Sequence, residues 1–219
     1  MTTDWLRHVQ AALVAAIAAF GIDAHASTYR IEPTETTARF EVHFLGVFPI
    51  RGDFRRTTGT LYYDPATRQG NIDVAIDATT LEASTAKAQA NARGADFFNV
   101  EKFASIDFKS SRFVFEDEKL RAVEGTLTLI GVSRPVTLVV NDSKCEPANE
   151  RAAAYCRADA TLTVKRSAFG MKAWSHTVGD EVVIQIVLMA RKTPEKSAEK
   201  APDSAAAASL NRVEPAKNP

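Results

Sequence analysis

The sequence lacks the residue clusters on which most enzyme active sites depend. Its 219 residues include only four histidines and two cysteines. There is no H-E-x-x-H pair, no G-x-S-x-G nucleophile turn and no glycine-rich phosphate loop. A catalytic zinc site needs three protein ligands and an open position. We therefore predict that the chain is not an enzyme and has no metal or cofactor of its own.

An excess of charge of either sign is also lacking. Lysine plus arginine number 27 and aspartate plus glutamate number 27, and neither sign is concentrated in the middle of the chain. Without a basic stripe, nucleic acid is not an expected partner. Beyond residue 26 there is no apolar run long enough to cross a bilayer, so we expect no stable membrane insertion of the mature chain.

The first 26 residues have the three parts of a secretory signal. Arg7 and His8 precede the uncharged stretch VQAALVAAIAAFGI, and Ala24-His25-Ala26 supplies the small residues of a cleavage site. The apolar part is about half of the ~20 residues that a membrane-spanning helix needs. We predict a signal peptide over residues 1–26, cleavage before Ser27 and a periplasmic location.

Large apolar residues are scarce again at the other end. Residues 192–219 are rich in alanine, proline, lysine and glutamate, a composition that cannot offset the entropy of ordering, so they are predicted to form a disordered tail. Residues 27–191 are then enough for one domain with a core.

Two cysteines flank the segment EPANERAAAY, which resembles a loop between two strands. An exported chain meets an oxidising compartment, so we predict a disulfide between Cys145 and Cys156. A metal site is the weaker alternative, because two thiolates alone are short of a tetrahedral set.

The body of the chain alternates apolar and polar residues with the period of two that marks half-buried strands. In TARFEVHF the apolar set is Ala38, Phe40, Val42 and Phe44, and NIDVAIDA behaves in the same way. About eight to ten such strands predict an all-β barrel or sandwich. The exception is STAKAQANARG, a predicted helix from Ser84 to Gly94 with hydroxyl residues at its start and a left-handed glycine at its end.

Several separate blocks resemble the YceI-like family, exported lipocalin-like barrels associated with binding polyisoprenoids and other lipids. The matching blocks are ARFEVHFLGVFPIRGDF, ADFFNVEKFASIDFKS and LTLIGVSRPVTL, followed by Arg166-Ser167, Phe169-Gly170-Met171 and Val178-Gly179-Asp180. The likeness extends from Tyr29 to Ala190. It implies an antiparallel lipocalin-like β-barrel of about eight strands with one short helix between strands. Within LTLIGVSRPV, we expect Gly131 to form a tight turn between adjacent strands and Pro135 to lie at a strand start.

This chain departs from the family pattern at three places. It has Glu35-Thr36 where the family commonly has a His-Ser pair, Ala92 where a leucine is usual, and Ala104 where a proline is usual. The first departure puts a head-group contact in doubt, whereas the other two mainly affect packing.

The resemblance implies a periplasmic protein that carries or sequesters an isoprenoid lipid, a polyprenyl chain or a quinone. Three groups of residues are expected to bind it. The inward apolar side chains are Phe40, Val42, Phe44, Ile106, Phe108, Leu127 and Leu129. Phe97 and Phe98 close one end of the barrel, and Arg166 and His43 are candidates for contact with the polar head. The alternative is a solidly packed barrel that acts as a protein-interaction or stress-response module, because a filled core and a cavity require the same alternation. A homodimer is left open.

Overall fold

The computed structural model describes residues 26–150 and 152–194. The predicted signal peptide, except Ala26, and the predicted tail beyond Pro194 lie outside the described residues. Among the residues described, no helix is long and apolar enough to cross a membrane.

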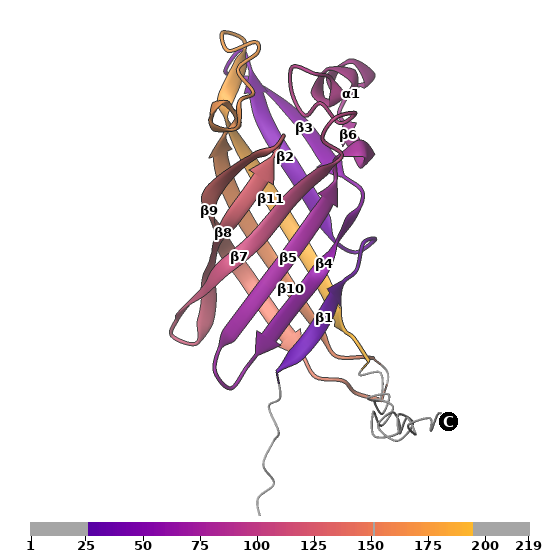
Figure 1. Ribbon diagram of the computed structural model, residues 1–219, viewed down its shortest axis with the longest axis vertical. Helices are drawn as coiled ribbons and strands as arrows, with labels where there is room; N and C mark the ends of the chain where they lie inside the picture. The colour runs from indigo at the N-terminus through magenta and orange to yellow at the C-terminus, as the bar shows by residue number, and fades with distance from the viewer. Residues whose placement is uncertain (1–25, 151, 195–219) are drawn as a thin grey trace, which may run out of the picture.

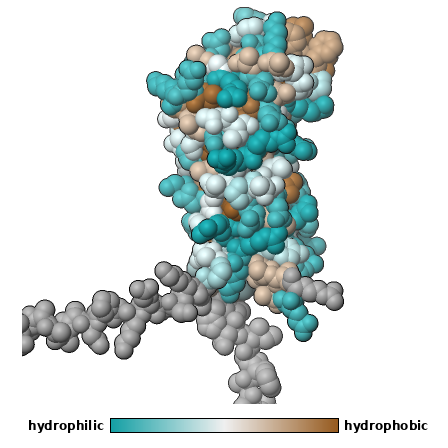
Figure 2. All heavy atoms as spheres, turned by 90° about the vertical axis from the view of Figure 1, so that its right-hand side faces the viewer, coloured by the Kyte–Doolittle hydropathy of each residue, from teal (hydrophilic) through white to brown (hydrophobic). Residues whose placement is uncertain are grey.

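Antiparallel strands wrap into a closed barrel, which confirms the predicted fold (Figure 1). Eight strands close the barrel in the order β1-β4-β5-β7-β8-β9-β10-β11, with β11 returning to β1. Polar side chains cover most of the wall facing the viewer in Figure 2. The described strands are β1 (Ser27–Ile31), β2 (Thr37–Phe44), β3 (Phe48–Phe54), β4 (Thr57–Asp64), β5 (Gln69–Asp77), β6 (Leu81–Ala83), β7 (Ser105–Glu116), β8 (Lys119–Leu129), β9 (Val132–Glu146), β10 (Tyr155–Lys165) and β11 (Val178–Lys192).

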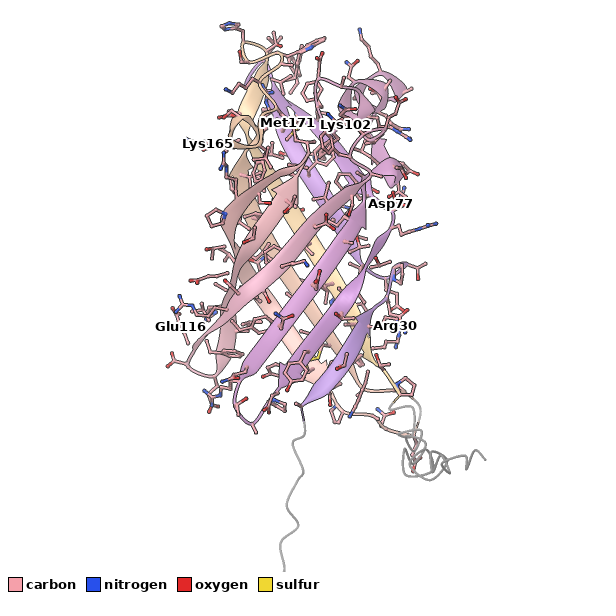
Figure 3. All side chains as sticks on the ribbon, in the orientation of Figure 1. Arg30, Asp77, Lys102, Glu116, Lys165 and Met171 are labelled. Atoms are coloured by element: carbon pink, nitrogen blue, oxygen red, sulfur yellow. A yellow bond between two sulfur atoms is a disulfide. The ribbon has the colours of Figure 1, made fainter. Side chains whose placement is uncertain are left out.

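The two ends of the barrel differ. The upper end in Figure 1 carries the helix α1 (Ala86–Arg93), the short 3-10 helix η2 (Arg166–Phe169) and the β2–β3 turn. The lower end carries the start of β1 and the β4–β5, β7–β8 and β9–β10 connections. Figure 3 places Met171 and Lys102 towards the upper end and Glu116 at the lower end.

Strand β11 changes partners partway along its length. Its first part pairs with β2 from Val178 to Val187, and its last residues, from Ala190 to Lys192, pair with β1. At the change, the Thr36 hydroxyl donates to the Met189 carbonyl at 3.3 Å and accepts from the Met189 amide at 3.1 Å. The lower half is therefore a closed ring, whereas β2, β3 and β6 form a collar on the upper half.

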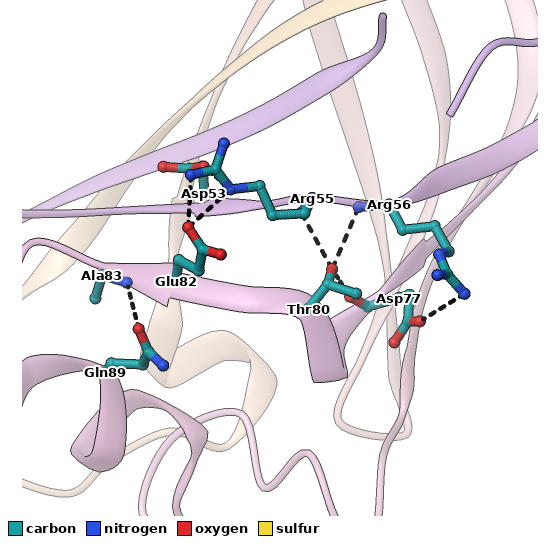
Figure 4. A network of polar contacts seen from close by, with 8 residues as sticks. All are labelled: Asp53, Arg55, Arg56, Asp77, Thr80, Glu82, Ala83 and Gln89. Atoms are coloured by element: carbon teal, nitrogen blue, oxygen red, sulfur yellow. Dashed lines mark hydrogen bonds and ion pairs between the residues drawn. The ribbon is translucent and has the colours of Figure 1, made fainter. Parts of the chain in front are cut away.

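Within the collar, polar contacts fix β6 to its neighbours (Figure 4). The Arg55 guanidinium donates to Glu82 at 2.5 and 2.8 Å, and the Thr80 hydroxyl accepts from the Arg55 amide at 3.1 Å. The Gln89 side chain of α1 accepts from the Ala83 amide at 3.3 Å. These contacts hold β6 against β3 and α1 against β6.

The helix prediction is right in place and wrong at its end. Thr85 caps α1 by accepting from the Ala88 amide, as expected for a hydroxyl residue. Gly94 is extended, with φ −71° and ψ 174°, and not left-handed. Its amide already bonds to the Asn91 carbonyl, so the helix ends without a left-handed residue.

The turn in LTLIGVSRPV joins adjacent antiparallel strands, as predicted. Ile130 and Gly131 have φ of 46° and 78° and form a two-residue turn of the kind that suits hairpins. Pro135, however, is the fourth residue of β9 and lies opposite Thr126, not at the strand start. Pairing between β9 and β10 extends only as far as Val139, so no strand on that side needs the amide hydrogen that proline lacks.

Candidate ligand-binding cavity

An apolar cavity of about 1080 Å³ runs along the inside of the barrel. Inward side chains of the barrel strands, together with β2, line it, and it reaches exposed residues at both ends. The volume is slightly above the roughly 300–1,000 Å³ of typical small-ligand sites. The alternating strands therefore enclose space and do not fill it completely.

The structure places ten of the eleven residues expected to bind the ligand around this cavity. They come from β2, β7, β8, η2 and the segment after α1, and they are Phe40, Val42, Phe44, Phe97, Phe98, Ile106, Phe108, Leu127, Leu129 and Arg166. The Phe98 ring lies 5.5 Å from the Phe40 ring and 5.4 Å from the Phe54 ring, measured between centroids. These three rings form an aromatic group in the cavity wall.

His43 is the residue that the structure does not bring to the cavity. It lies on the outer face of β2, its side chain is 49% exposed, and its Nε2 is 3.7 Å from the Glu41 carboxylate. Glu41 also accepts from Arg51 Nε at 2.6 Å. His43 therefore belongs to a surface charge cluster.

Arg166 is a buried cation at the upper end of the cavity, only 3% exposed. Its guanidinium donates four hydrogen bonds, all to backbone carbonyls: Met171 and Ala173 at 2.7 Å, and Val178 and Gly179 at 2.9 Å. No carboxylate of a described residue lies within 4.0 Å of it. Since a guanidinium has five N–H groups, one remains uncommitted.

The Phe97 ring lies near this cation, with its centroid 5.8 Å from the Arg166 guanidinium carbon. That distance is within the range of a cation–π contact. The upper end of the cavity thus combines aromatic rings with one positive charge.

Sequence reasoning missed part of the lining. Phe113 and Phe115 also face the cavity, although their odd positions are out of phase with Ile106 and Phe108. The cause is a β-bulge at Ser111, where the β7–β8 register shifts and the alternation changes phase. The last two strands contribute further aliphatic residues, among them Leu162, Val164, Val182, Ile184 and Ile186. Their alternation was visible in the sequence and could have selected them.

The departures from the family pattern lie in two different environments. Glu35 accepts from Arg191 Nη2 at 2.6 Å at the surface. Thr36 lines the cavity, but its hydroxyl is bonded to the Met189 backbone. Ala92 and Ala88 of α1 line the upper mouth and leave it wider than a leucine would.

The lower end of the cavity has a charged rim. Exposed residues of the β7–β8, β9 and β10 segments line it, namely Glu118, Lys119, Arg121, Lys144 and Arg157. Burial raises the pKa of the nearby Tyr63 phenol, which is neutral at physiological pH. In the described parts of the chain, no three His, Cys, Asp or Glu side chains are grouped to hold a metal.

The predicted disulfide is present at this lower end. Cys145 of β9 lies directly opposite Cys156 of β10, their Cα atoms are 4.0 Å apart, and their sulfurs are bonded. The bridge therefore joins two neighbouring strands beside the connection between them.

Comparisons with known proteins give a consistent result. The family model described as a YceI-like domain matches residues 29–190. A UPF0312 protein of Vibrio cholerae serotype O1 is 30% identical over 128 residues, which cover 57% of this chain and 68% of the relative. The protein YceI of Salmonella arizonae is 31% identical over 118 residues, 52% of this chain and 61% of that protein.

Solved structures share the barrel. BcnA of Burkholderia cenocepacia superposes with a TM-score of 0.58 and 23% identity, covering 73% of this chain and 98% of BcnA. A polyisoprenoid binding domain from Saccharophagus degradans, implicated in plant cell wall breakdown, gives a TM-score of 0.55 and 13% identity over 77% of this chain and all of that domain. At these identities the likeness concerns the fold.

Proposed function

The chain belongs to the YceI-like domain family, and from that premise we propose that it binds an isoprenoid-type lipid, a polyprenyl chain or a quinone, inside its barrel and carries or sequesters it in the periplasm. The observation that carries the proposal is the apolar cavity of about 1080 Å³ along the barrel. A carrier needs no reactive group, so the proposal includes no catalytic step.

The shape and lining of the cavity suit a long hydrocarbon chain. Side chains such as Phe108, Leu127 and Ile184 present hydrocarbon surface along its length. Transfer of apolar surface out of water contributes about 25 cal/mol per Å². An isoprenoid chain is almost entirely apolar surface, so this term alone favours its burial. A structural neighbour with the same fold is a polyisoprenoid binding domain, which supports the ligand class.

We assign the polar head of the ligand to Arg166. The remaining N–H of this guanidinium can donate to a quinone carbonyl, a hydroxyl or a phosphate oxygen. Its four carbonyl partners hold the group in position. The exposed location of His43 gives it no part in this head-group contact.

The cavity also favours the carrier function over the alternative, in which the barrel acts only through its outer surface. A protein-interaction module needs no enclosed apolar space, and protein interiors normally pack with few voids larger than a water molecule. A cavity of this volume therefore supports a ligand inside the barrel, because surface binding alone does not require it.

The test is organic extraction of the protein purified from its native host, followed by mass spectrometry. We expect one isoprenoid-type lipid per chain. Repeated absence of lipid, together with no uptake of added polyprenol or quinone, would leave the interaction module as the better account.

A cavity-filling variant makes this test specific. Ala160 of β10 faces the cavity, whereas Val139 of β9, opposite the next residue Thr161, is exposed on the outer wall. Ala160→Phe should fold and lose bound lipid because its ring occupies the ligand's space, and Val139→Phe should keep the lipid. Equal lipid content in both folded variants would contradict binding at this level of the barrel.

A further inference from the structure

The upper end of the barrel exposes large apolar side chains on two loops. Leu45, Val47 and Phe48 belong to the β2–β3 hairpin, and Trp174 belongs to the loop between η2 and β11; their exposed fractions range from 50% to 69%. We call these four residues the apolar tip. The other exposed large apolar residues of the described chain, Tyr62, Val139 and Val183, are scattered on strands of the wall. Figure 2 shows hydrophobic residues gathered at the upper end of the molecule.

Hydrogen bonds hold the two loops in place at the upper end of the barrel. The Leu45 amide donates to the Thr177 carbonyl at 2.6 Å, and the Trp174 indole N–H donates to the Asp96 carboxylate at 3.3 Å. At the hairpin turn, a side chain on Gly46 would meet nothing within 4 Å. The turn therefore projects into solvent while its base is held by neighbouring segments.

The apolar tip carries no negative charge of its own. Residues 44–50 contain no charged side chain, and residues 170–177 contain Lys172 and His176 but no aspartate or glutamate. One carboxylate, Asp96, contacts the tip: it accepts a hydrogen bond from the Trp174 indole and keeps its negative charge. The charges beside the tip, Lys172 and Asp96, offset each other, so attachment to a bilayer would rest on the apolar side chains and not on attraction to anionic head groups.

The same segments also lead into the cavity. Phe44, Pro49 and Ile50 of the hairpin line the cavity, as does Trp174. The opposite end has a charged rim that includes Lys119, Arg121 and Lys144 and is suited to water. The upper mouth has polar residues on its α1 side, among them Lys87 and Asn91, but along the hairpin and Trp174 an apolar chain would stay in contact with apolar side chains. At the lower end, a departing chain would meet the charged rim and solvent.

We propose that the apolar tip docks on the surface of a lipid bilayer, with Leu45, Val47, Phe48 and Trp174 at the depth of the head groups and the upper mouth of the cavity facing the membrane. The purpose of this docking rests on the proposed function, because a water-insoluble lipid has to be taken from a membrane and returned to one. Tryptophan favours the membrane–water boundary, and phenylalanine and leucine are typical of the apolar face of segments that lie in it. Four side chains give weak, reversible attachment, as a carrier requires.

The sequence supplies a direct reporter of this contact. The chain has two tryptophans, Trp5 and Trp174. In a Trp5→Phe background Trp174 is the only tryptophan, whatever the start of the exported chain. With vesicles of equal parts phosphatidylcholine and phosphatidylglycerol, its emission should shift to shorter wavelength, and lipids brominated near the head group should quench it. Absence of both effects would overturn the proposal.

A matched pair of variants separates the tip from general hydrophobicity. Leu45→Asn with Val47→Asn removes two tip side chains, and asparagine tolerates the positive φ of 51° at position 45. The control, Val139→Asn with Val183→Asn, removes two exposed apolar side chains from the wall. We expect vesicle co-sedimentation to fall by about tenfold in the first variant only. Equal losses, or none in the tip variant, would contradict docking by the tip.

Failure of docking and failure of the carrier function give different results. If the purified protein contains lipid, but the tip variant takes lipid from vesicles as fast as the unmodified protein, docking is wrong and the carrier stands. If Trp174 responds to vesicles while no isoprenoid binds under any condition, docking stands and the carrier function is wrong. A third result would also overturn the proposal. If, without vesicles, Trp174 emission shifts to shorter wavelength as the protein concentration rises, and the protein has the mass of a dimer, the tip binds a second copy of the chain.

Discussion

Arg166 connects two segments at the upper end of the barrel. Its guanidinium binds the carbonyls of Met171 and Ala173 in the loop after η2, and those of Val178 and Gly179 at the start of β11. A buried carbonyl without a donor destabilises the folded state by about 1–3 kcal/mol. The charge is therefore structural, in addition to the head-group contact proposed for it.

Replacing Arg166 by methionine should destabilise the protein strongly. Four carbonyls would lose their donor, so we expect the free energy of unfolding to fall by at least about 3 kcal/mol, which corresponds to roughly 6–12 °C in Tm for a domain of this size. Arg51→Met is the control, because Arg51 is exposed and its ion pair with Glu41 should contribute less than about 1 kcal/mol. Thermal unfolding of both variants checks this; equal shifts would mean that Arg166 does not anchor the loop.

A second residue makes stability depend on pH. Asp180 accepts from the Ser167 backbone amide at 2.9 Å and from the Ser167 hydroxyl at 2.8 Å, and these bonds lower the pKa of its carboxyl, the backbone bond most. Because the folded-state pKa lies below the unfolded one of about 3.9, the contribution is complete above that value and is lost as pH falls through the folded pKa.

Asp180→Asn keeps one acceptor oxygen and removes the charge, so it tests this dependence. The variant should be less stable than the unmodified protein at neutral pH, and the difference should shrink as pH falls below about 4. Urea unfolding at a series of pH values measures it. A difference that stays constant down to the acid limit would show that the carboxylate charge is not involved.

At the scale of elements, the strands were predictable and their irregularities were not. The alternation in β2 and in the first part of β7 placed Phe40, Val42, Ile106 and Phe108 on the inner face, because a half-buried strand enforces a period of two. The bulge at Ser111 leaves only an indirect trace in the sequence, the change from even to odd positions between Phe108 and Phe113, and that change could equally mark the end of one strand and the start of another.

Burial of Arg166 was likewise not predictable from its neighbours. Its four partners are backbone carbonyls, and these come together only when η2 and β11 meet. A residue's backbone partners leave no signature in side-chain patterns. The sequence could therefore single out Arg166 as a candidate, but not its hydrogen bonds.

The disulfide makes a testable contribution at the same scale. It closes the connection between β9 and β10, with a separation of 11 residues between the cysteines. A loop of this length is worth roughly 2–3 kcal/mol in the chain-entropy model, so Cys145→Ala with Cys156→Ala should lower Tm by about 4–12 °C. Dithiothreitol should lower the Tm of the unmodified protein similarly and leave the double variant unchanged. An effect of the reductant on the double variant would point to another cause.

At the scale of the whole molecule, Thr193 makes the last backbone hydrogen bond between the end of the described chain and the barrel. Its amide donates to the Thr28 carbonyl of β1 at 2.9 Å. Residues 195–219 contain almost no large apolar side chain. The barrel's stability should therefore depend on the chain up to Pro194 and not beyond it.

Deleting residues 195–219 should leave Tm within about 1–2 °C of the full chain. A matched deletion from Lys192 onward removes the end of β11 and the Thr193 contact, and it should lower Tm clearly. Differential scanning calorimetry compares the three proteins. A large drop from the shorter deletion alone would mean that the terminal residues pack on the barrel.

Because β11 changes partners along its length, the two halves of the barrel differ in how easily they can widen. A ring closed by hydrogen bonds on every side, as in the lower half, has a fixed bore, because widening it would break a complete row of backbone bonds. The collar ends at β6, which pairs only with β3 among the described strands, so it can spread without breaking a row. The lower half should therefore set a limit on the thickness of a bound chain, whereas the upper half should tolerate a bulkier group.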